Sequence, residues 1–131
     1  MLFALSDGSG VEIVGSTRDL QDLRKSIRTC ESFCSIPLSV PAQFDDRGLR
    51  YLKELIIRVD ADSLNVWEQN QQLFIAGAKQ KLEVLSENVD YLLGSKANRP
   101  VPNRDHLHVE YYPGHFFLAE GALPLILVRQ D

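Results

Sequence analysis

Two helical segments with the same apolar spacing lie 62 residues apart, and they constrain the fold more than any other feature of this chain. In each segment apolar residues recur at i, i+3, i+7 and i+10, which places them on one face of a helix. The positions are Leu20, Leu23, Ile27 and Cys30 in the first segment, and Leu82, Leu85, Val89 and Leu92 in the second. The spacing predicts one helix over Thr17 to Cys30 and another from about Ala78 to Leu93.

The same shift also superimposes what comes before each helix, a short apolar strand ending in Gly15 or Gly77. Further along, Leu55-Ile56-Ile57 corresponds more loosely to Leu125-Ile126-Leu127. Any strand followed by a helix gives similar spacing, so the match between the two halves could be a coincidence. The alternative is an internal repeat of two β-β-α-β-β halves, residues 1–62 and 63–131.

Alternating apolar and polar residues between turn signals predict the strands. They fall at residues 2–5, 11–14, 33–41, 52–59, 64–68, 73–76, 106–112 and 124–128. Pro37 and Pro41 mark the third of these as an edge strand or an extended connector, since proline cannot donate to a sheet ladder. Ser16 or Thr17 is placed to cap the first helix, and Gly94 to end the second in a left-handed conformation. The prediction is an α+β fold in a single domain, residues 1–131, with a mainly antiparallel sheet and two helices packed on one face.

Composition excludes several classes of protein. The 131 residues are 44% hydrophobic and 24% charged, which is typical of a folded globular domain. The net charge of −4 argues against a nucleic-acid partner, whose binders usually carry a basic stripe. Apolar runs such as Leu123 to Val128 are too short to cross a membrane, and the N-terminus does not resemble a secretory signal. We therefore expect a cytoplasmic protein with no membrane partner.

The two cysteines, Cys30 and Cys34, are expected to be reduced and partly buried. Two thiols do not supply the four ligands of a structural zinc site, and a cytoplasmic compartment disfavours a disulfide. No nucleophile elbow, phosphate loop or dinucleotide fingerprint is present.

All three histidines fall in one stretch, residues 105–117. If residues 106 to 112 form a strand, His106, His108, Glu110 and Tyr112 share one face, and the aliphatic residues between them share the other. Pro113-Gly114 then ends the strand and leaves His115, Phe116 and Phe117 in a loop.

Three interpretations of this polar face are open. The histidines could be partly buried residues that serve the fold. They could belong to a binding surface, with Tyr112, His115 and Phe116 as aromatic anchors and Glu110 as a polar contact. They could also share a metal ion with Glu110, although a hydrolytic site usually needs further ligands from other strands.

The pattern His-x-His-x-Glu-Tyr-Tyr-Pro-Gly-His at 106–115, followed by Leu-Pro-Leu-Ile-Leu, resembles the immunity protein 32 family of bacterial polymorphic toxin systems. The strand 73–76 with Gly77 and its leucine-rich helix resembles the core of that family, so the resemblance covers roughly residues 64–129. It implies a small cytoplasmic α+β protein that binds a cognate toxin and blocks it. The family motif falls on His106, His108, Glu110, Tyr112 and His115, and nothing in it identifies these residues as catalytic.

From these observations we expect an immunity protein that acts by stoichiometric binding and not as an enzyme, without a cofactor or metal. The expected partner-binding residues are His106, His108, Glu110, Tyr112, His115 and Phe116. One alternative is a small metal-dependent enzyme that uses His106, His108 and Glu110. Another is a structural module that forms homodimers or larger assemblies through an open sheet edge.

Overall fold

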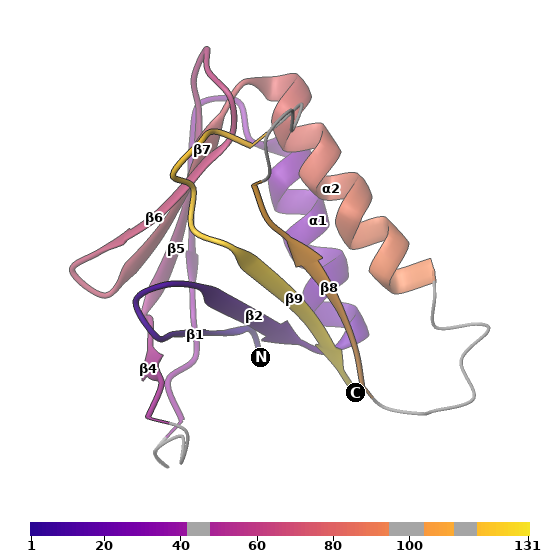
Figure 1. The fold of residues 1–131 in the computed structure, drawn as a ribbon. Helices are drawn as coiled ribbons and strands as arrows, with labels where there is room; N and C mark the ends of the chain where they lie inside the picture. The colour runs from indigo at the N-terminus through magenta and orange to yellow at the C-terminus, as the bar shows by residue number, and fades with distance from the viewer. Residues whose placement is uncertain (42–47, 95–103, 112–117) are drawn as a thin grey trace.

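The computed structural model describes residues 1–41, 48–94, 104–111 and 118–131, and Figure 1 shows two helices and two sheets. The helices are α1 (Thr17–Thr29) and α2 (Lys79–Gly94). The strands are β1 (Phe3–Ser6), β2 (Val11–Gly15), β3 (Phe33–Pro37), β4 (Arg50–Tyr51), β5 (Glu54–Val59), β6 (Asn65–Gln69), β7 (Gln72–Gly77), β8 (Arg104–Val109) and β9 (Leu125–Gln130). The α+β prediction is confirmed.

The strands form two sheets where the sequence predicted one. A five-stranded sheet has the order β4-β1-β2-β9-β8, and a four-stranded sheet has the order β3-β5-β7-β6. Most neighbours are antiparallel, and each sheet contains one parallel pair, β2 with β9 or β5 with β7. The predicted strand 52–59 explains the difference. Leu52 N–H donates to Ala4 in the first sheet, whereas Lys53 C=O accepts from Leu38 beside the second, so the chain changes sheets between β4 and β5.

The two sheets repeat one pairing pattern. In the order β1-β2-β9-β8 the pairings are antiparallel, parallel and antiparallel, and β6-β7-β5-β3 has the same sequence of pairings. Apart from β4, which belongs to the first half, each sheet therefore takes its hairpin from one half of the chain and its other two strands from the other half. The internal repeat stays a prediction, which this pattern favours.

Both helices follow from their sequences. Ser16 caps α1 in a capping box: its hydroxyl accepts from Asp19 N–H, and the Asp19 carboxylate accepts from Ser16 N–H. The predicted stripes of both helices are buried and belong to one core cluster. Gly94 is the last residue of α2 and does not have a positive φ, so the predicted left-handed cap is wrong. Among the described residues, no helix is both long and apolar enough to cross a membrane.

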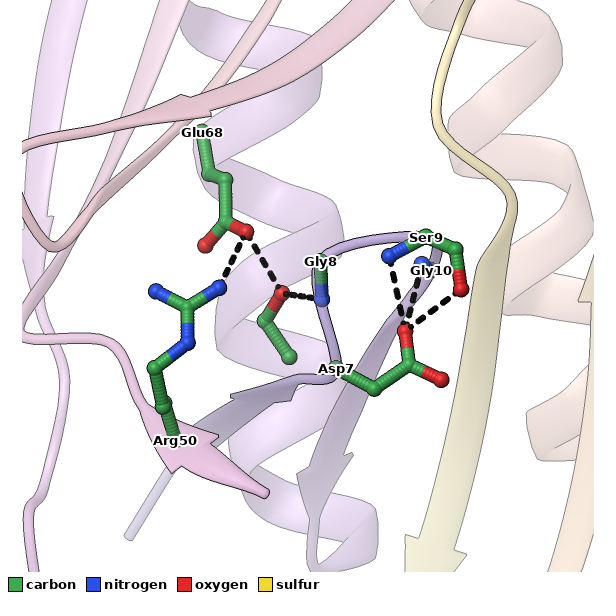
Figure 2. A network of polar contacts seen from close by, with 7 residues as sticks. Asp7, Gly8, Ser9, Gly10, Arg50 and Glu68 are labelled. Carbon is green, nitrogen blue, oxygen red and sulfur yellow. Dashed lines mark hydrogen bonds and ion pairs between the residues drawn. The ribbon is translucent and has the colours of Figure 1, made fainter. Parts of the chain in front are cut away.

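A polar network joins the two sheets at one end of β1 (Figure 2). The Glu68 carboxylate of β6 accepts hydrogen bonds from the buried Ser6 hydroxyl at 2.8 Å and from Arg50 Nη2 at 2.7 Å. Glu68 thus connects the second sheet to β1 and β4 of the first. Ser6 Oγ also accepts from Gly8 N–H at 3.0 Å, so the network includes the turn that links β1 to β2.

That turn is held by the Asp7 carboxylate, which accepts from Ser9 N–H, Ser9 Oγ and Gly10 N–H at 2.8 to 2.9 Å (Figure 2). The hydrogen bond from Ser9 N–H is the main cause of a lowered pKa for Asp7. Gly8 has a φ of 90°, a conformation that glycine adopts without steric cost.

Asp90 of α2 bridges the helices through ion pairs to Arg24 and Arg28 of α1. The hydrogen bond from Arg24 is the largest cause that lowers the pKa of Asp90, and both guanidinium charges add to it. We expect Asp90→Asn to lower the free energy of unfolding by about 1 kcal/mol at pH 7, because both pairs are partly exposed to solvent. A carboxylate with a lowered folded pKa stabilises the fold above its unfolded pKa of about 4, and this contribution is lost as the pH falls through the folded value.

Urea unfolding of wild type and Asp90→Asn at pH 7 and at about pH 2.5 measures this. The difference in free energy of unfolding between the two proteins should be present at pH 7 and shrink in acid. A difference that does not change with pH would show that packing, and not the charge of Asp90, is responsible.

Candidate functional site

The histidine strand is β8, at the edge of the five-stranded sheet. It pairs with β9 in antiparallel register, with His106 opposite Val128 and His108 opposite Ile126. Asp105 and Val109 are buried, whereas His106 and His108 are exposed. The predicted alternation of faces is therefore present, and both imidazoles are available to a partner.

The strand is displaced relative to the prediction, since it begins at Arg104 and ends at Val109. Glu110 lies just beyond its end and is exposed. Tyr112, His115 and Phe116, three of the predicted binding residues, lie outside the described residues. Their role stays a prediction.

His106, His108 and Glu110 form a small polar cluster. The imidazole ring centroids of the two histidines are 5.3 Å apart with the planes at 77°, an edge-to-face contact. His108 Nδ1 lies 3.2 Å from Glu110 Oε1, and both side chains are about half exposed (52% and 53%). These groups can donate and accept hydrogen bonds at the surface. In the parts of the chain that the structure describes, no group of three or more His, Cys, Asp or Glu side chains is close enough to hold a metal ion.

The face of β8 opposite the histidines packs against the core. Val109 and its partner Leu125 belong to the main core, and Leu107 packs against it. The Asp105 side chain accepts a hydrogen bond at Oδ1 from His106 N–H, at 2.9 Å. The histidines therefore project from a strand whose other face is fixed by packing.

An open cleft of about 510 Å³ lies on the same face of this sheet as the histidines, toward the opposite edge. Sequence reasoning missed this cleft. Its lining comes from β1, β2, β4, the start of α1 and the C-terminal end of β9, including Phe3, Leu5, Glu12, Val14, Asp19, Tyr51, Gln130 and Asp131. The period-two pattern of β1 and β2 could have placed Phe3, Glu12 and Val14 on one face. Nothing in the sequence indicated that Tyr51 would join them, because that requires β4 to pair with β1.

A second surface that the sequence analysis did not single out lies on the four-stranded sheet. Trp67 and Phe74 stack with ring centroids 5.0 Å apart, and the Arg58 guanidinium lies 5.4 Å from the Trp67 ring. Phe33, on the edge strand β3, is 59% exposed. In their strands these three residues, Trp67, Phe74 and Arg58, alternate with buried residues. The period-two pattern therefore indicates which face of the sheet each side chain lies on, but not that the three lie close together.

Both cysteines are free, as expected. Cys30 is buried, and its thiol contacts the Ile57 carbonyl at 3.7 Å. Burial, and then the neighbouring Cys30, raise the pKa of Cys34 to about 11. Cys34 is therefore a protonated thiol at neutral pH, which does not suit a nucleophile.

One known family matches the part of the chain that contains β7, α2, β8 and β9. Residues 72–130 match the Immunity protein 32 family. The match confirms the resemblance inferred from the histidine motif, and it includes His106, His108 and Glu110. A match to Immunity protein 32 supports an immunity function in general and implies a protein partner. A search of the curated proteins found no match.

Proposed function

We propose that this chain neutralises a cognate bacterial toxin in the cytoplasm by binding it stoichiometrically, and that the face of β8 carrying His106 and His108 contacts the toxin. The observation that carries the proposal is the exposure of both histidines on an edge strand inside the region that matches Immunity protein 32. The aliphatic face of the same strand packs on the core, so the polar residues on its other face are not needed to fill the interior.

The chemistry of the face suits recognition. Two imidazoles and the Glu110 carboxylate offer several hydrogen-bonding atoms on a strand held in register by β9. A rigid strand loses little conformational entropy on binding, which leaves more of the contact energy for affinity. Tyr112, His115 and Phe116 follow directly in the sequence and are proposed to extend the contact.

The test uses the toxin domain encoded by the neighbouring gene, purified in an inactivated form. We expect a 1:1 complex with the wild-type chain by calorimetry. The His106→Ala/His108→Ala double variant should bind at least about tenfold more weakly, which is about 1.4 kcal/mol and within the range of interface hot spots. Its melting temperature should be close to that of wild type, because both side chains are exposed.

The matched control is Glu83→Ala/Glu87→Ala, a double variant on the exposed side of α2. It should bind the toxin domain like wild type. Equal affinities for the histidine variant, the control and wild type would show that the toxin does not use this face. Absence of any complex with wild type would contradict the immunity function itself.

A further inference from the structure

The face of the four-stranded sheet that is turned away from the core carries a pair of stacked aromatic rings. Trp67 of β6 lies opposite Phe74 of β7, and their rings are 5.0 Å apart with the planes at 4°. Both side chains are partly exposed and neither belongs to the core cluster, whereas their strand neighbours Val66, Leu73 and Ile75 do. The ring pair is therefore part of the protein surface.

Arg58 of β5 lies on the same face. Its guanidinium carbon is 5.4 Å from the centre of the Trp67 ring. Arg58 is exposed, and within the described part of the chain its side chain forms no hydrogen bond or ion pair. A guanidinium that stacks on an aromatic ring keeps N–H donors at its edge for a carboxylate. The ring thus positions the charge of Arg58 without neutralising it.

A depression of about 400 Å³ borders these two side chains. Ala76 lies between Arg58 and Asn65 in the strand register, and all three line the depression together with Trp67. Ala76 is buried, so the floor at this point is apolar. The depression therefore combines an apolar floor, an indole ring and a guanidinium, and it is large enough to admit a side chain of another protein.

The turn after β5 lines the other end of the depression with two carboxylates, Asp60 and Asp62. Asp60 Oδ1 accepts a hydrogen bond from Asp62 N–H at 3.0 Å, which fixes the turn. Neither of these described residues forms an ion pair with Arg58. Because like charges repel, the aspartates disfavour an anion at their own end of the depression. An acidic occupant is thereby restricted to one carboxylate beside Arg58.

The depression also borders the segment that follows the histidine motif. Leu118 forms a β-bridge with Leu64, and Ala119 N–H donates to Leu64 C=O at 2.8 Å. Ala119 lines the depression. Three of the predicted partner-binding residues fall within residues 112–117, which follow β8 and directly precede Leu118. Along the chain, these predicted contacts are bounded by the histidine strand on one side and by the depression on the other.

We propose that the depression receives an acidic side chain of the protein partner, an aspartate or a glutamate, whose carboxylate pairs with Arg58 where Arg58 stacks on Trp67. The inference rests on the proposed function for the identity of the partner. Arginine and carboxylate form two parallel charge-assisted hydrogen bonds, and tryptophan and arginine are enriched among interface hot spots. Stacking on Trp67 orients the guanidinium in advance, so that less side-chain entropy is lost on binding.

The contribution of Arg58 is measured by calorimetry with the inactivated toxin domain. Arg58→Gln should raise the dissociation constant about tenfold. Arg18→Gln, which removes the same charge from an exposed position of α1, should change it less than twofold. The melting temperature of Arg58→Gln should stay close to that of wild type, because the Arg58 side chain is exposed. Equal affinities for Arg58→Gln and Arg18→Gln would overturn the proposal.

The sign of the occupant's charge is tested with Asp62→Asn. Asp62 lines the depression and is exposed. Removing its charge should lower the dissociation constant about twofold if the occupant is acidic, since a repulsion is lost. A higher dissociation constant for Asp62→Asn would indicate a cationic occupant and would overturn the inference.

Occupancy is observed directly at Trp67, which is the single tryptophan of the chain. Labelling with 5-fluorotryptophan therefore gives one ¹⁹F resonance, which is distinct from any tryptophan of the unlabelled toxin domain. This resonance should shift on addition of the toxin domain and stop changing at a 1:1 ratio. A resonance that is unchanged at saturation would show that the toxin does not reach Trp67.

The acidic group of the partner is identified by double-mutant cycles. Among Asp→Asn and Glu→Gln variants of the toxin domain, one should bind the wild-type chain about tenfold more weakly and bind Arg58→Gln no more weakly than the unchanged toxin domain does. If no variant shows this coupling, or if binding depends on His106 and His108 but not on Arg58, the carboxylate inference fails and the immunity function stands. If wild type does not bind the toxin domain at all, both fail.

Discussion

Replacing Gly77 by alanine should lower the free energy of unfolding by about 3 kcal/mol, as expected for a buried site with no room for an added methyl group. A Cβ at Gly77 would lie 2.9 Å from Leu64 Cα and 3.2 Å from Leu64 N. These are backbone atoms, which cannot move away as the end of a flexible side chain can. Gly77 C=O accepts a hydrogen bond from Asp60 N–H, and Ala78 N–H donates to the Asp62 carbonyl. These two hydrogen bonds also fix the backbone at Gly77, so it cannot easily shift to make room for a methyl group.

Thermal and urea unfolding of Gly77→Ala measure this effect, and Gly94→Ala is the matched control. Nothing lies within 4 Å of a Cβ at Gly94, at the end of α2, so alanine there should be neutral or stabilise by up to about 1 kcal/mol. The corresponding glycine of the first half, Gly15, is also crowded, at 2.8 Å from Asp19 Cβ and 2.9 Å from Leu2 Cδ1. A Gly77→Ala protein as stable as Gly94→Ala would contradict the close approach of the two segments.

Glu68→Ala should lower the free energy of unfolding by about 2 kcal/mol, because it removes the hydrogen-bond acceptor of the fully buried Ser6 hydroxyl. Ser6 is 0% exposed and donates to Glu68 Oε1 (Figure 2), and an unsatisfied buried donor costs about 1 to 3 kcal/mol. The ion pair to Arg50 adds less, since the Arg50 side chain is 57% exposed. Glu68→Gln retains an oxygen acceptor and should cost less than about 1 kcal/mol.

A double-mutant cycle isolates the contact. In Ser6→Ala/Glu68→Ala the hydroxyl is gone, so the double variant should be more stable than the sum of the single changes predicts, by about 1 kcal/mol. Additive effects, or a Glu68→Ala protein with wild-type stability, would show that the hydroxyl finds another partner.

The helices could be predicted from the sequence because their signals are local. The leucine stripes, the capping pair Ser16 and Asp19, and the prolines that place β3 at a sheet edge all act within a few residues. The division into two sheets could not be predicted, since a strand's alternation shows which side is buried but not which strand pairs with it. β4 pairs with β1 while β5, only two residues later, pairs with β3 and β7.

The same limit applies to the candidate site. The alternation of Asp105 to Val109 gave the histidine face correctly, because it needed only the period of one strand. Prediction of the cleft needed the order of four strands, β4-β1-β2-β9, and Tyr51 entered it through a two-residue strand that no periodicity could reveal. The stacked pair Trp67 and Phe74 depended on the register of the β6–β7 hairpin in the same way.

The exchange of strands between the two halves has a consequence for how the protein is made. Val11 pairs with Leu125, near the other end of the sequence, so the five-stranded sheet cannot close until nearly all of these residues have left the ribosome. Contacts so distant along the chain slow folding, because a long loop must be ordered before any of its pairing is gained. The β1–β2 hairpin would therefore wait through most of the synthesis of these residues before β9 could pair with it.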